Sequence, residues 1–307
     1  MCEKDDVQQW GSEMTVVVSK KAGFLLAGAT VVGVIIVSAL AIINAPPRSI
    51  VWERDYEKAV QRASAEKKII LADMFTDWCV LCKDMDQETF GNPTLIAEMA
   101  RKYVWLKLNT ETEEDGKKLQ SEFGIMTYPM VLVLDFKGQE IDRIDRFLQP
   151  QPFKQAVEHH LQDPESLGKV RERVEKAPES IELRSALGNK LLDRKNYRKA
   201  AAEFQHVIEL DPQNRAGKTV ESYYNLALSL ASQTKFDEAI AQLTVLEKTF
   251  PDAEEVANAH VLRGQIYECC GEKDKAVNVF REYLKKYPRH SYVNRVKEIL
   301  AAMEASN

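Results

Sequence analysis

The feature that most constrains the fold is an internal repeat in the C-terminal half of the chain. Pro212, Pro251 and Pro288 each follow a pair of segments whose apolar residues recur at helical spacing. Aligning the segments on these prolines places small and large apolar residues at the same offsets. The aligned sets are Leu187-Gly188, Ala200 and Phe204; Leu226-Ala227, Ala239 and Leu243; and Gly264, Tyr267, Ala276 and Phe280. Small residues let paired helices approach closely and large ones fill the groove between repeats, so the pattern predicts stacked helix pairs.

This pattern is typical of tetratricopeptide (TPR) repeats, whose period is about 34 residues. The prolines lie somewhat farther apart than one period, so we expect longer connections at residues 213–218 and 252–258. A plain helical bundle would not reproduce three sets of matching offsets. Residues 180–304 are therefore predicted to form an all-α TPR solenoid that ends in a capping helix over Ser291–Met303.

Residues 163–179 are interpreted as a linker or a partial repeat, because Pro178 lies one period before Pro212. TPR arrays usually bind peptides or partner proteins on their concave face. We therefore expect a protein or peptide partner on the TPR surface, and a spacer or dimer contact is the alternative for so short an array. Tyr223 and Tyr224 suit the repeat core as well as they suit a ligand.

The cysteines give the second constraint. The chain has five, Cys2, Cys79, Cys82, Cys269 and Cys270, which is too few for a disulfide framework. Cys79 and Cys82 form a C-x-x-C pair, which is found in zinc sites and in redox sites. Structural zinc needs four ligands, and no further cysteine or histidine lies near the pair in sequence, so we expect neither a metal nor another cofactor. Cys2 is interpreted as an ordinary thiol, and Cys269-Cys270 as small apolar residues at a helix end rather than a redox pair.

Length and charge limit the possible architectures and partners. The 307 residues suggest about two domains. Hydrophobic residues make up 45% of the chain, which is enough to build a core in each half. The net charge is −5 and the chain lacks a long basic run, so no nucleic-acid partner is expected.

The segment around the C-x-x-C pair predicts an α/β domain over residues 48–162. Short apolar runs suited to buried strands alternate with amphipathic segments, which indicates a mixed sheet with helices on its faces. The predicted strands are residues 69–75, 104–108, 130–134 and 141–144, and the predicted helices are residues 54–67, 82–89, a segment from Pro93, 115–123 and 151–161.

Four features of this segment occur in the order found in a known family. They are the apolar strand over residues 69–75, Asp73 in that strand, the string Trp78-Cys79-x-x-Cys82-Lys83, and Tyr128-Pro129 before a later strand. Over about residues 51–161 the chain resembles the thioredoxin fold, and most of all the C-terminal periplasmic domain of the transmembrane reductant conductor DsbD. The resemblance implies a thiol–disulfide oxidoreductase.

Each motif residue has a chemical role in that fold. A cysteine at a helix N-terminus is favoured as thiolate, so Cys79 is the expected nucleophile, and Cys82, one turn on, can resolve the mixed disulfide. The resemblance implies that Asp73 is a buried acid, whose raised pKa would let it exchange protons with Cys82. An ordinary carboxylate at a strand end is the alternative for Asp73.

The resemblance also predicts a substrate-binding edge. Pro129 matches the cis-proline of the family, although a trans turn proline is the alternative, and Tyr128 would help to shape that edge. Trp78 would shield the cysteine pair on one side. The dipeptide between the cysteines is Val-Leu rather than the Gly-Pro of thioredoxin, which leaves the direction of electron flow open.

An uncharged apolar run near the N-terminus predicts a membrane anchor. Residues 22–44 are long enough to span the hydrocarbon core as a helix. A cleaved signal peptide, with a site at Ala39-x-Ala41, is the alternative. Lys20 and Lys21 flank the run and favour a cytoplasmic tail over residues 1–21. The soluble domains would then be periplasmic or extracytoplasmic, on a single-pass protein of the inner membrane.

These features lead to a functional hypothesis. The chain is predicted to be a membrane-anchored oxidoreductase that reduces protein disulfides outside the cytoplasm, while its TPR repeats recruit a partner. A membrane electron donor, or delivery to cytochrome assembly, would fit the anchor. The alternatives are a TPR scaffold or assembly factor, whose thioredoxin-like domain mainly binds partners, and a holdase chaperone.

Overall fold

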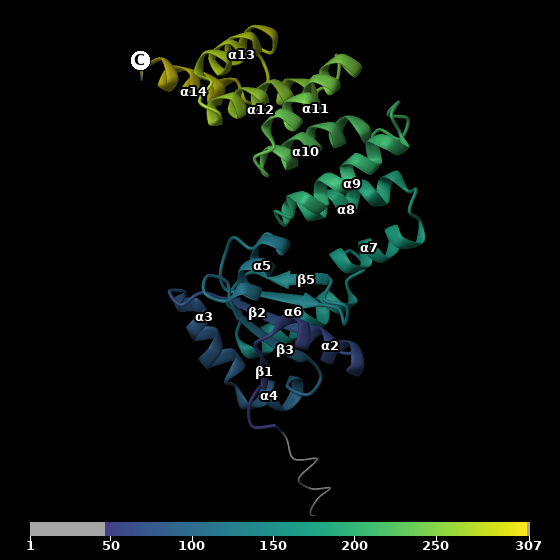
Figure 1. The fold of residues 1–307 in the computed structure, drawn as a ribbon, viewed down its shortest axis with the longest axis vertical. Coiled ribbons are helices and arrows are strands. Elements are labelled where there is room, and N and C mark those ends of the chain that lie inside the picture. The colour runs from purple at the N-terminus through teal and green to yellow at the C-terminus, as the bar shows by residue number, and fades with distance from the viewer. Residues whose placement is uncertain (1–46, 306–307) are drawn as a thin grey trace, which may run out of the picture. The chain divides into compact units, whose positions relative to one another are not determined.

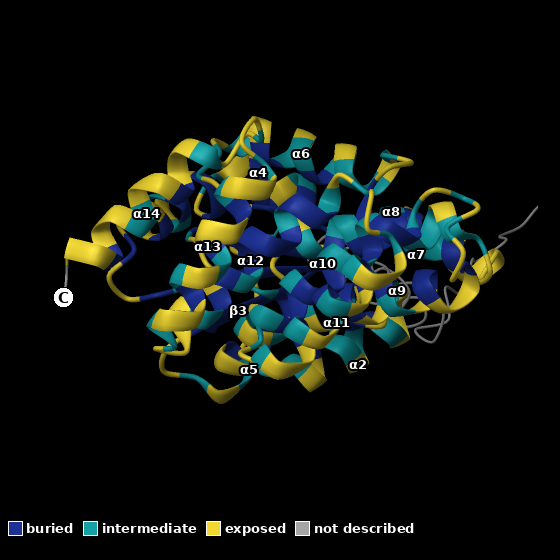
Figure 2. Ribbon diagram, turned by 90° about the horizontal axis from the view of Figure 1, so that it is seen from above, coloured by how far each residue is buried: buried dark blue, intermediate teal, exposed yellow. Residues whose placement is uncertain are grey.

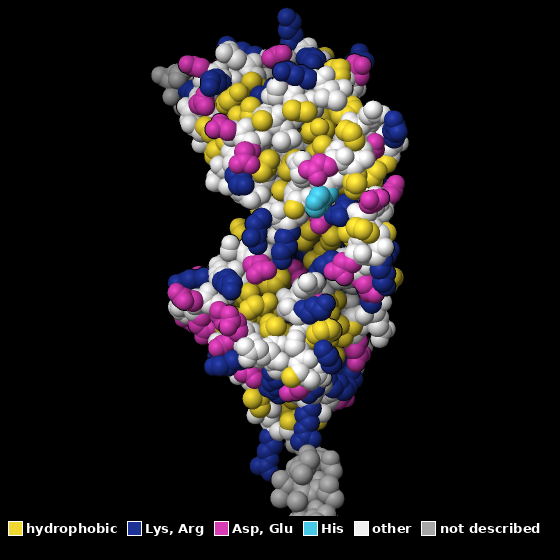
Figure 3. Space-filling view, turned by 45° about the vertical axis from the view of Figure 1, so that its right-hand side comes forward, with side chains coloured by type: hydrophobic (Ala, Val, Ile, Leu, Met, Phe, Trp, Pro, Cys, Tyr) yellow, Lys and Arg dark blue, Asp and Glu magenta, His cyan; other side chains and the backbone are white. Residues whose placement is uncertain are grey.

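The computed structural model describes residues 47–305 of the chain. The predicted tail over residues 1–21, the predicted transmembrane helix over residues 22–44 and Cys2 lie outside this range. Among the described residues, no helix combines the length and apolarity needed to cross a bilayer. Lys and Arg side chains are interspersed with Asp and Glu over the face seen in Figure 3.

A five-stranded mixed sheet is the centre of the first domain (Figure 1). Its order is β1-β3-β2-β4-β5; β3 is parallel to β1 and β2, and β4 is antiparallel to β2 and β5. The strands are β1 (Trp52–Glu53), β2 (Ile70–Phe75), β3 (Val104–Asn109), β4 (Met130–Leu134) and β5 (Glu140–Ile144). The three central strands are largely apolar because helices cover both sheet faces. The sequence analysis missed β1, since two residues are too few to show a pattern.

Alternate residues of the central strands enter two separate cores. Ile70, Ala72 and Met74 pack with α2 and α5, whereas Leu71 and Trp105 pack with η1, α4 and α6. These helices are α2 (Tyr56–Glu66), α3 (Val80–Asp84), the π-helical turn η1 (Met85–Phe90), α4 (Pro93–Met99), α5 (Glu114–Phe123) and α6 (Pro150–Gln162).

The single helix expected over residues 82–89 is in fact two elements. The α-helix α3 ends at Asp84, and the wider π turn η1 follows it. Within η1, Met85 and Phe90 are buried, while the Asp86 carboxylate reaches a lysine of the sheet. Such π turns are frequent at functional sites, and nothing in the local helical spacing distinguishes them from an α-helix.

Helix pairs follow the sheet domain and stack in sequence order (Figure 1). Figure 2 shows their buried faces turned toward one another. Close approach depends on glycine, since a Cβ at Gly188 would lie 2.8 Å from the Phe204 ring, and one at Gly264 2.3 Å from the Phe280 ring. The helices are α7 (Leu167–Lys176), α8 (Ile181–Asp193), α9 (Tyr197–Leu210), α10 (Thr219–Ala231), α11 (Phe236–Thr249), α12 (Glu255–Cys269), α13 (Lys273–Lys286) and α14 (Val293–Ala305).

The connections differ in part from the expected ones. An irregular loop joins α9 to α10, as predicted for residues 213–218. The connection predicted at 252–258 is shorter, because α12 already begins at Glu255. Tyr223 and Tyr224 pack half-buried against the repeat core.

Candidate active site

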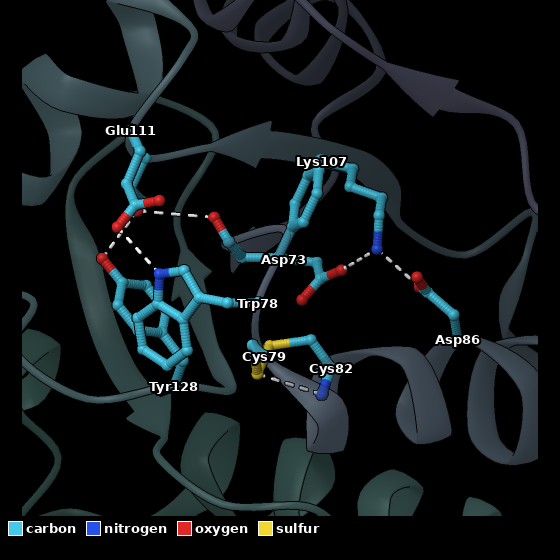
Figure 4. The surroundings of a disulfide bond; sticks show 10 residues. Asp73, Trp78, Cys79, Cys82, Asp86, Lys107, Glu111 and Tyr128 are labelled. Carbon is cyan, nitrogen blue, oxygen red and sulfur yellow. Dashed lines mark hydrogen bonds and ion pairs between the residues drawn. A yellow bond between two sulfur atoms is a disulfide. The ribbon is translucent and has the colours of Figure 1, made fainter.

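The centre of the site is a disulfide between Cys79 and Cys82 (Figure 4). Cys79 is the N-cap of α3, and its Sγ accepts a hydrogen bond from the Cys82 amide at 3.1 Å. The two residues are 4% and 3% exposed. A backbone N–H that points at the Cys79 sulfur stabilises the thiolate once the disulfide is reduced, so the local geometry favours Cys79 as the nucleophile.

A buried carboxyl group lies behind the disulfide. Asp73 is 2% exposed and belongs to β2, which leads into the loop that carries Cys79. Burial raises the pKa of Asp73 to about 6, and the charge and hydrogen bond of Lys107 only partly oppose this rise. A carboxyl group with that pKa can both accept and release a proton near neutral pH.

Lys107 connects Asp73 to a second carboxylate. Its Nζ lies 2.5 Å from Asp73 Oδ2 and 2.5 Å from Asp86 Oδ1 (Figure 4). Asp73 and Lys107 are register partners on β2 and β3, so the sheet itself fixes this contact. Asp86 comes from η1 and its side chain is 41% exposed, which connects the buried pair to solvent.

Aromatic rings enclose the Lys107 ammonium group. Its Nζ is 4.6 Å from the ring centroid of Phe75, 5.4 Å from that of Trp52 and 6.0 Å from that of Phe90. These faces favour a cation, while the apolar surroundings exclude water. Lys107 and Asp86 were not predicted as site residues from the sequence. The available signal was the lone charge at Lys107 within the otherwise apolar run 104–108.

Two other predicted site residues, Trp78 and Tyr128, lie together on one side of the disulfide (Figure 4). The Tyr128–Pro129 bond is cis, as the resemblance implies. The β2–β4 register pairs Met74 with Met130, which places Pro129 beside the start of the cysteine loop. The Tyr128 ring lies edge-on to Trp78, with centroids 5.8 Å apart, and the Tyr128 hydroxyl is 2.6 Å from the Thr110 hydroxyl.

Trp78 is fixed in place but is open to solvent. Its indole N–H donates to Glu111 at 2.9 Å, and the residue is 63% exposed. Val80 and Leu81, the dipeptide between the cysteines, are 67% and 49% exposed. The disulfide is therefore buried beneath a rim of exposed apolar side chains.

The other two cysteines of the described residues lie in the C-terminal helices, apart from this site. Cys269 and Cys270 are free thiols exposed at the end of α12, and Gly271 ends the helix with φ +74°. Within residues 47–305, no group of three or more His, Cys, Asp or Glu side chains is arranged to hold a metal ion.

Comparison with known families matches both halves of the chain. Residues 51–135 match the thioredoxin-like family, and residues 185–254 and 224–291 match the tetratricopeptide repeat family. The chain is a thioredoxin-like domain fused to TPR repeats. The thioredoxin-like match covers the elements from β1 to β4, and the TPR match begins within α8.

Known relatives match the thioredoxin-like domain. The thiol:disulfide interchange protein DsbD of Pseudoalteromonas atlantica is 30% identical over 102 residues, which are 32% of this chain and 17% of that protein. The chain thus matches less than a fifth of the length of this curated relative.

Two solved structures cover the same part of the chain. A putative disulphide-isomerase from Bacteroides thetaiotaomicron is 25% identical, with a TM-score of 0.35, and the match covers 39% of this chain and 98% of that one. The DsbD C-terminal domain of Neisseria meningitidis, in its oxidised form, is 21% identical with a TM-score of 0.32, covering 36% of this chain and 99% of that one.

Proposed function

We propose that this protein is a thiol–disulfide oxidoreductase that reduces disulfide bonds of client proteins. The observation that carries the proposal is the position of the Cys79–Cys82 pair. It lies at a helix N-terminus, above a buried carboxyl group whose pKa is about 6. This arrangement supplies both a stabilised thiolate and a proton acceptor.

The proposed reaction begins with both cysteines reduced. The Cys79 thiolate attacks one sulfur of the client disulfide; a mixed disulfide forms, and the other client sulfur leaves as a thiolate and takes a proton from water. Cys82 then gives its proton to the Asp73 carboxylate and attacks the Cys79 sulfur. The second client thiolate leaves, the Cys79–Cys82 disulfide forms, and two electrons have passed to the client.

Lys107 and Asp86 support the proton transfer. A buried carboxylate without a partner would be strongly destabilised, and Lys107 offsets this enough to keep Asp73 ionisable near neutral pH. Asp86 reaches solvent from the other side of Lys107. This pathway lets the proton that Asp73 accepts be returned to water between turnovers.

The proposal also includes where the protein acts, what reduces it and how it meets its client. An anchor at residues 22–44 would hold both domains on the outer side of the inner membrane. A membrane electron donor would reduce the pair again, and the TPR domain would recruit the client. Support comes from the uncharged apolar run of the sequence and from the likeness of the thioredoxin-like domain to DsbD.

The test is client reduction by the full chain with a dithiol donor. Cys79→Ser should abolish turnover, and Cys82→Ser should accumulate a mixed disulfide with the client that is detectable by mass. The control, Cys269→Ser/Cys270→Ser, should behave as the unmodified chain. Turnover that survives Cys79→Ser would contradict the proposal and favour the TPR scaffold.

The direction of electron flow has its own measurement. The reduction potential of the Cys79–Cys82 pair, from equilibration with thiol buffers, should lie near that of thioredoxin, about −270 mV. A potential near that of DsbA, about −120 mV, would make the protein a disulfide donor and overturn the reductase direction.

A further inference from the structure

The turn between α8 and α9 is docked on the thioredoxin-like domain. Arg194 Nη2 lies 2.5 Å from Asp142 Oδ1 on β5, and the Asn196 side-chain amide donates to the Glu122 carbonyl at 2.8 Å. A Cβ at Gly124 would lie 2.6 Å from the Lys195 carbonyl oxygen, so the two backbones are in close contact. The turn is thereby fixed beside the segment that leads to the cis-proline.

The same turn in the second repeat lacks these docking groups. Lys195 and Thr234 occupy equivalent positions, with φ of 59° and 61°. In both turns the backbone N–H of this residue bonds to the carbonyl three residues earlier. Gln233 stands where the first turn has Arg194. The side chains of the first turn, rather than its backbone geometry, therefore provide the docking.

A surface pocket of about 360 Å³ opens between this turn and the loop before the cis bond. Met126 and Thr127, both exposed, line it on the thioredoxin-like side. Asp193 and Lys195, also exposed, line it on the TPR side. Both domains thus contribute to the pocket, and Thr127 and Met130, which directly flank the Tyr128–Pro129 bond, both line it.

Exposed apolar side chains lie next to the cysteines in sequence and in the loop that lines this pocket. Of the large apolar side chains exposed on the thioredoxin-like domain, four belong to the cysteine loop or to the cis-proline loop. They are Trp78, Val80, Leu81 and Met126, and the last is 75% exposed. Trp78 contacts Tyr128, two residues beyond Met126. Exposed apolar side chains that gather near a reactive group are typical of an interaction site.

We propose that the α8–α9 turn forms the far wall of the client site. The pocket accommodates the extended client segment that adjoins the reacting cysteine, with an apolar side chain against Met126. This inference rests on the proposed function. The charged side chains that line the pocket are balanced in sign, with three acidic and three basic ones: Asp142, Asp145, Asp193, Arg143, Arg194 and Lys195. The pocket therefore distinguishes clients by the length of chain beside the cysteine rather than by their charge. An extended chain advances about 3.3 Å per residue, so a client with several residues beside its cysteine extends farther toward the pocket than a client with one.

The test uses the full chain and two synthetic peptides, each joined to a thiol reporter by a disulfide. The short peptide has one residue on either side of its cysteine, and the long peptide has five. Asp193→Trp fills the pocket from an exposed position of α8. For the long peptide, it should raise KM about tenfold and leave kcat near that of the unmodified chain. Reduction of the short peptide should change less than about twofold, which also shows that the variant is folded.

The matched control is Ser232→Trp, the equivalent position in the second repeat. It should leave KM and kcat unchanged for both peptides, since that turn lacks the docking groups. If Asp193→Trp and the unmodified chain have equal KM values for the long peptide, this inference is overturned and the proposed function is not. Failure of the unmodified chain to reduce either peptide would overturn the proposed function, and this inference with it.

Discussion

At the scale of single residues, the site depends on charges placed where water is excluded. Asp73 is almost fully buried, and burial raises its pKa to about 6, even though Lys107 lies 2.5 Å away. Desolvation therefore outweighs the ion pair in setting the protonation of this group. The same residue is expected to lower the stability of the fold and to speed the reaction, and the two effects can be measured separately.

The first prediction concerns the stability effect of Asp73. The folded-state pKa is raised from 3.8 to about 6, so the wild type loses stability as the pH rises through this window and loses none below it. Asp73→Asn should therefore unfold with a free energy higher by about 3 kcal/mol at pH 7.5, because each pKa unit is about 1.4 kcal/mol. Denaturant unfolding of the oxidised protein should show this gain shrink toward zero near pH 4. An equal difference at both pH values would contradict the prediction.

The second prediction concerns the chemistry of Asp73. If its carboxylate accepts the Cys82 proton, the resolving step should speed up as the pH rises through about 6. In Asp73→Asn that step should slow by about 10²-fold at pH 7 and follow the ordinary ionisation of a thiol, at about pH 8.5. Rapid acid quenching of the mixed disulfide, followed by mass analysis, measures the step. Identical pH profiles for the two proteins would remove Asp73 from the mechanism.

At the scale of elements, the helix pairs depend on matched sizes of facing residues. In the first and third repeats, glycine faces a phenylalanine ring at less than ordinary contact distance for a Cβ. The second repeat carries Ala227 and Leu243 at the equivalent positions. A larger residue on one helix is thus accompanied by a smaller one on its partner, as close packing requires.

The third prediction tests this size matching. Gly264→Ala places a Cβ 2.3 Å from the Phe280 ring and should lower the free energy of unfolding by about 1–3 kcal/mol. Gly264→Ala/Phe280→Leu reproduces the residue pair of the second repeat, so it should be less destabilised than the sum of its single variants. Denaturant unfolding followed by circular dichroism checks both. Strict additivity of the two changes would show that the residues are not coupled.

At the scale of the whole described chain, an ion-pair cluster joins the two domains. Glu140 on β5 is paired with Arg143, and its Oε1 lies 3.4 Å from Arg194 Nε. Asp142 pairs with Arg194 and with His160. Burial alone would raise the pKa of Asp142, but His160 and Arg194 outweigh it and lower the pKa to about 2.

The fourth prediction is that this cluster sets the stability of domain docking. Arg194→Ala leaves two buried carboxylates with fewer partners and should weaken the docking by about 2–4 kcal/mol. Amide hydrogen exchange should therefore become faster in β5 and in the α8–α9 turn. Gln233→Ala, at the equivalent position of the second repeat, should leave the exchange rates of β5 and of the α8–α9 turn unchanged. Unaltered exchange in Arg194→Ala would show that the other contacts hold the turn on the thioredoxin-like domain without this ion pair.

The docking should also depend on pH. The pKa of Asp142 is lowered in the folded protein, so its contribution is present above its ordinary pKa and is lost as the pH falls toward about 2. In the wild type, the protection of amides in the α8–α9 turn, measured against the exchange of an unfolded chain at the same pH, should therefore fall between about pH 4 and pH 2. In Arg194→Ala this loss of protection should be smaller.

The sequence by itself determined the elements that depend on local pattern. Apolar runs located β2, β3, β4 and β5, the repeated offsets located the helix pairs, and the spacing of Cys79 and Cys82 identified the reactive pair. These signals are readable because each arises from residues that are close together in the chain. The resemblance added Asp73 and the cis bond before Pro129, which the local pattern alone did not require.

The tertiary structure alone decided which distant residues meet. Lys107 pairs with Asp73 across two strands and with Asp86 on the π turn, and Arg194 crosses from the first repeat to β5. The sequence does not show which residue a charged side chain will pair with, because the partner depends on strand register and on which surfaces pack together. The contacts of Lys107 with Asp73 and Asp86 and the pocket beside the cis-proline are therefore properties of the folded chain, whereas the helix pairs and the cysteine pair are already evident in its sequence.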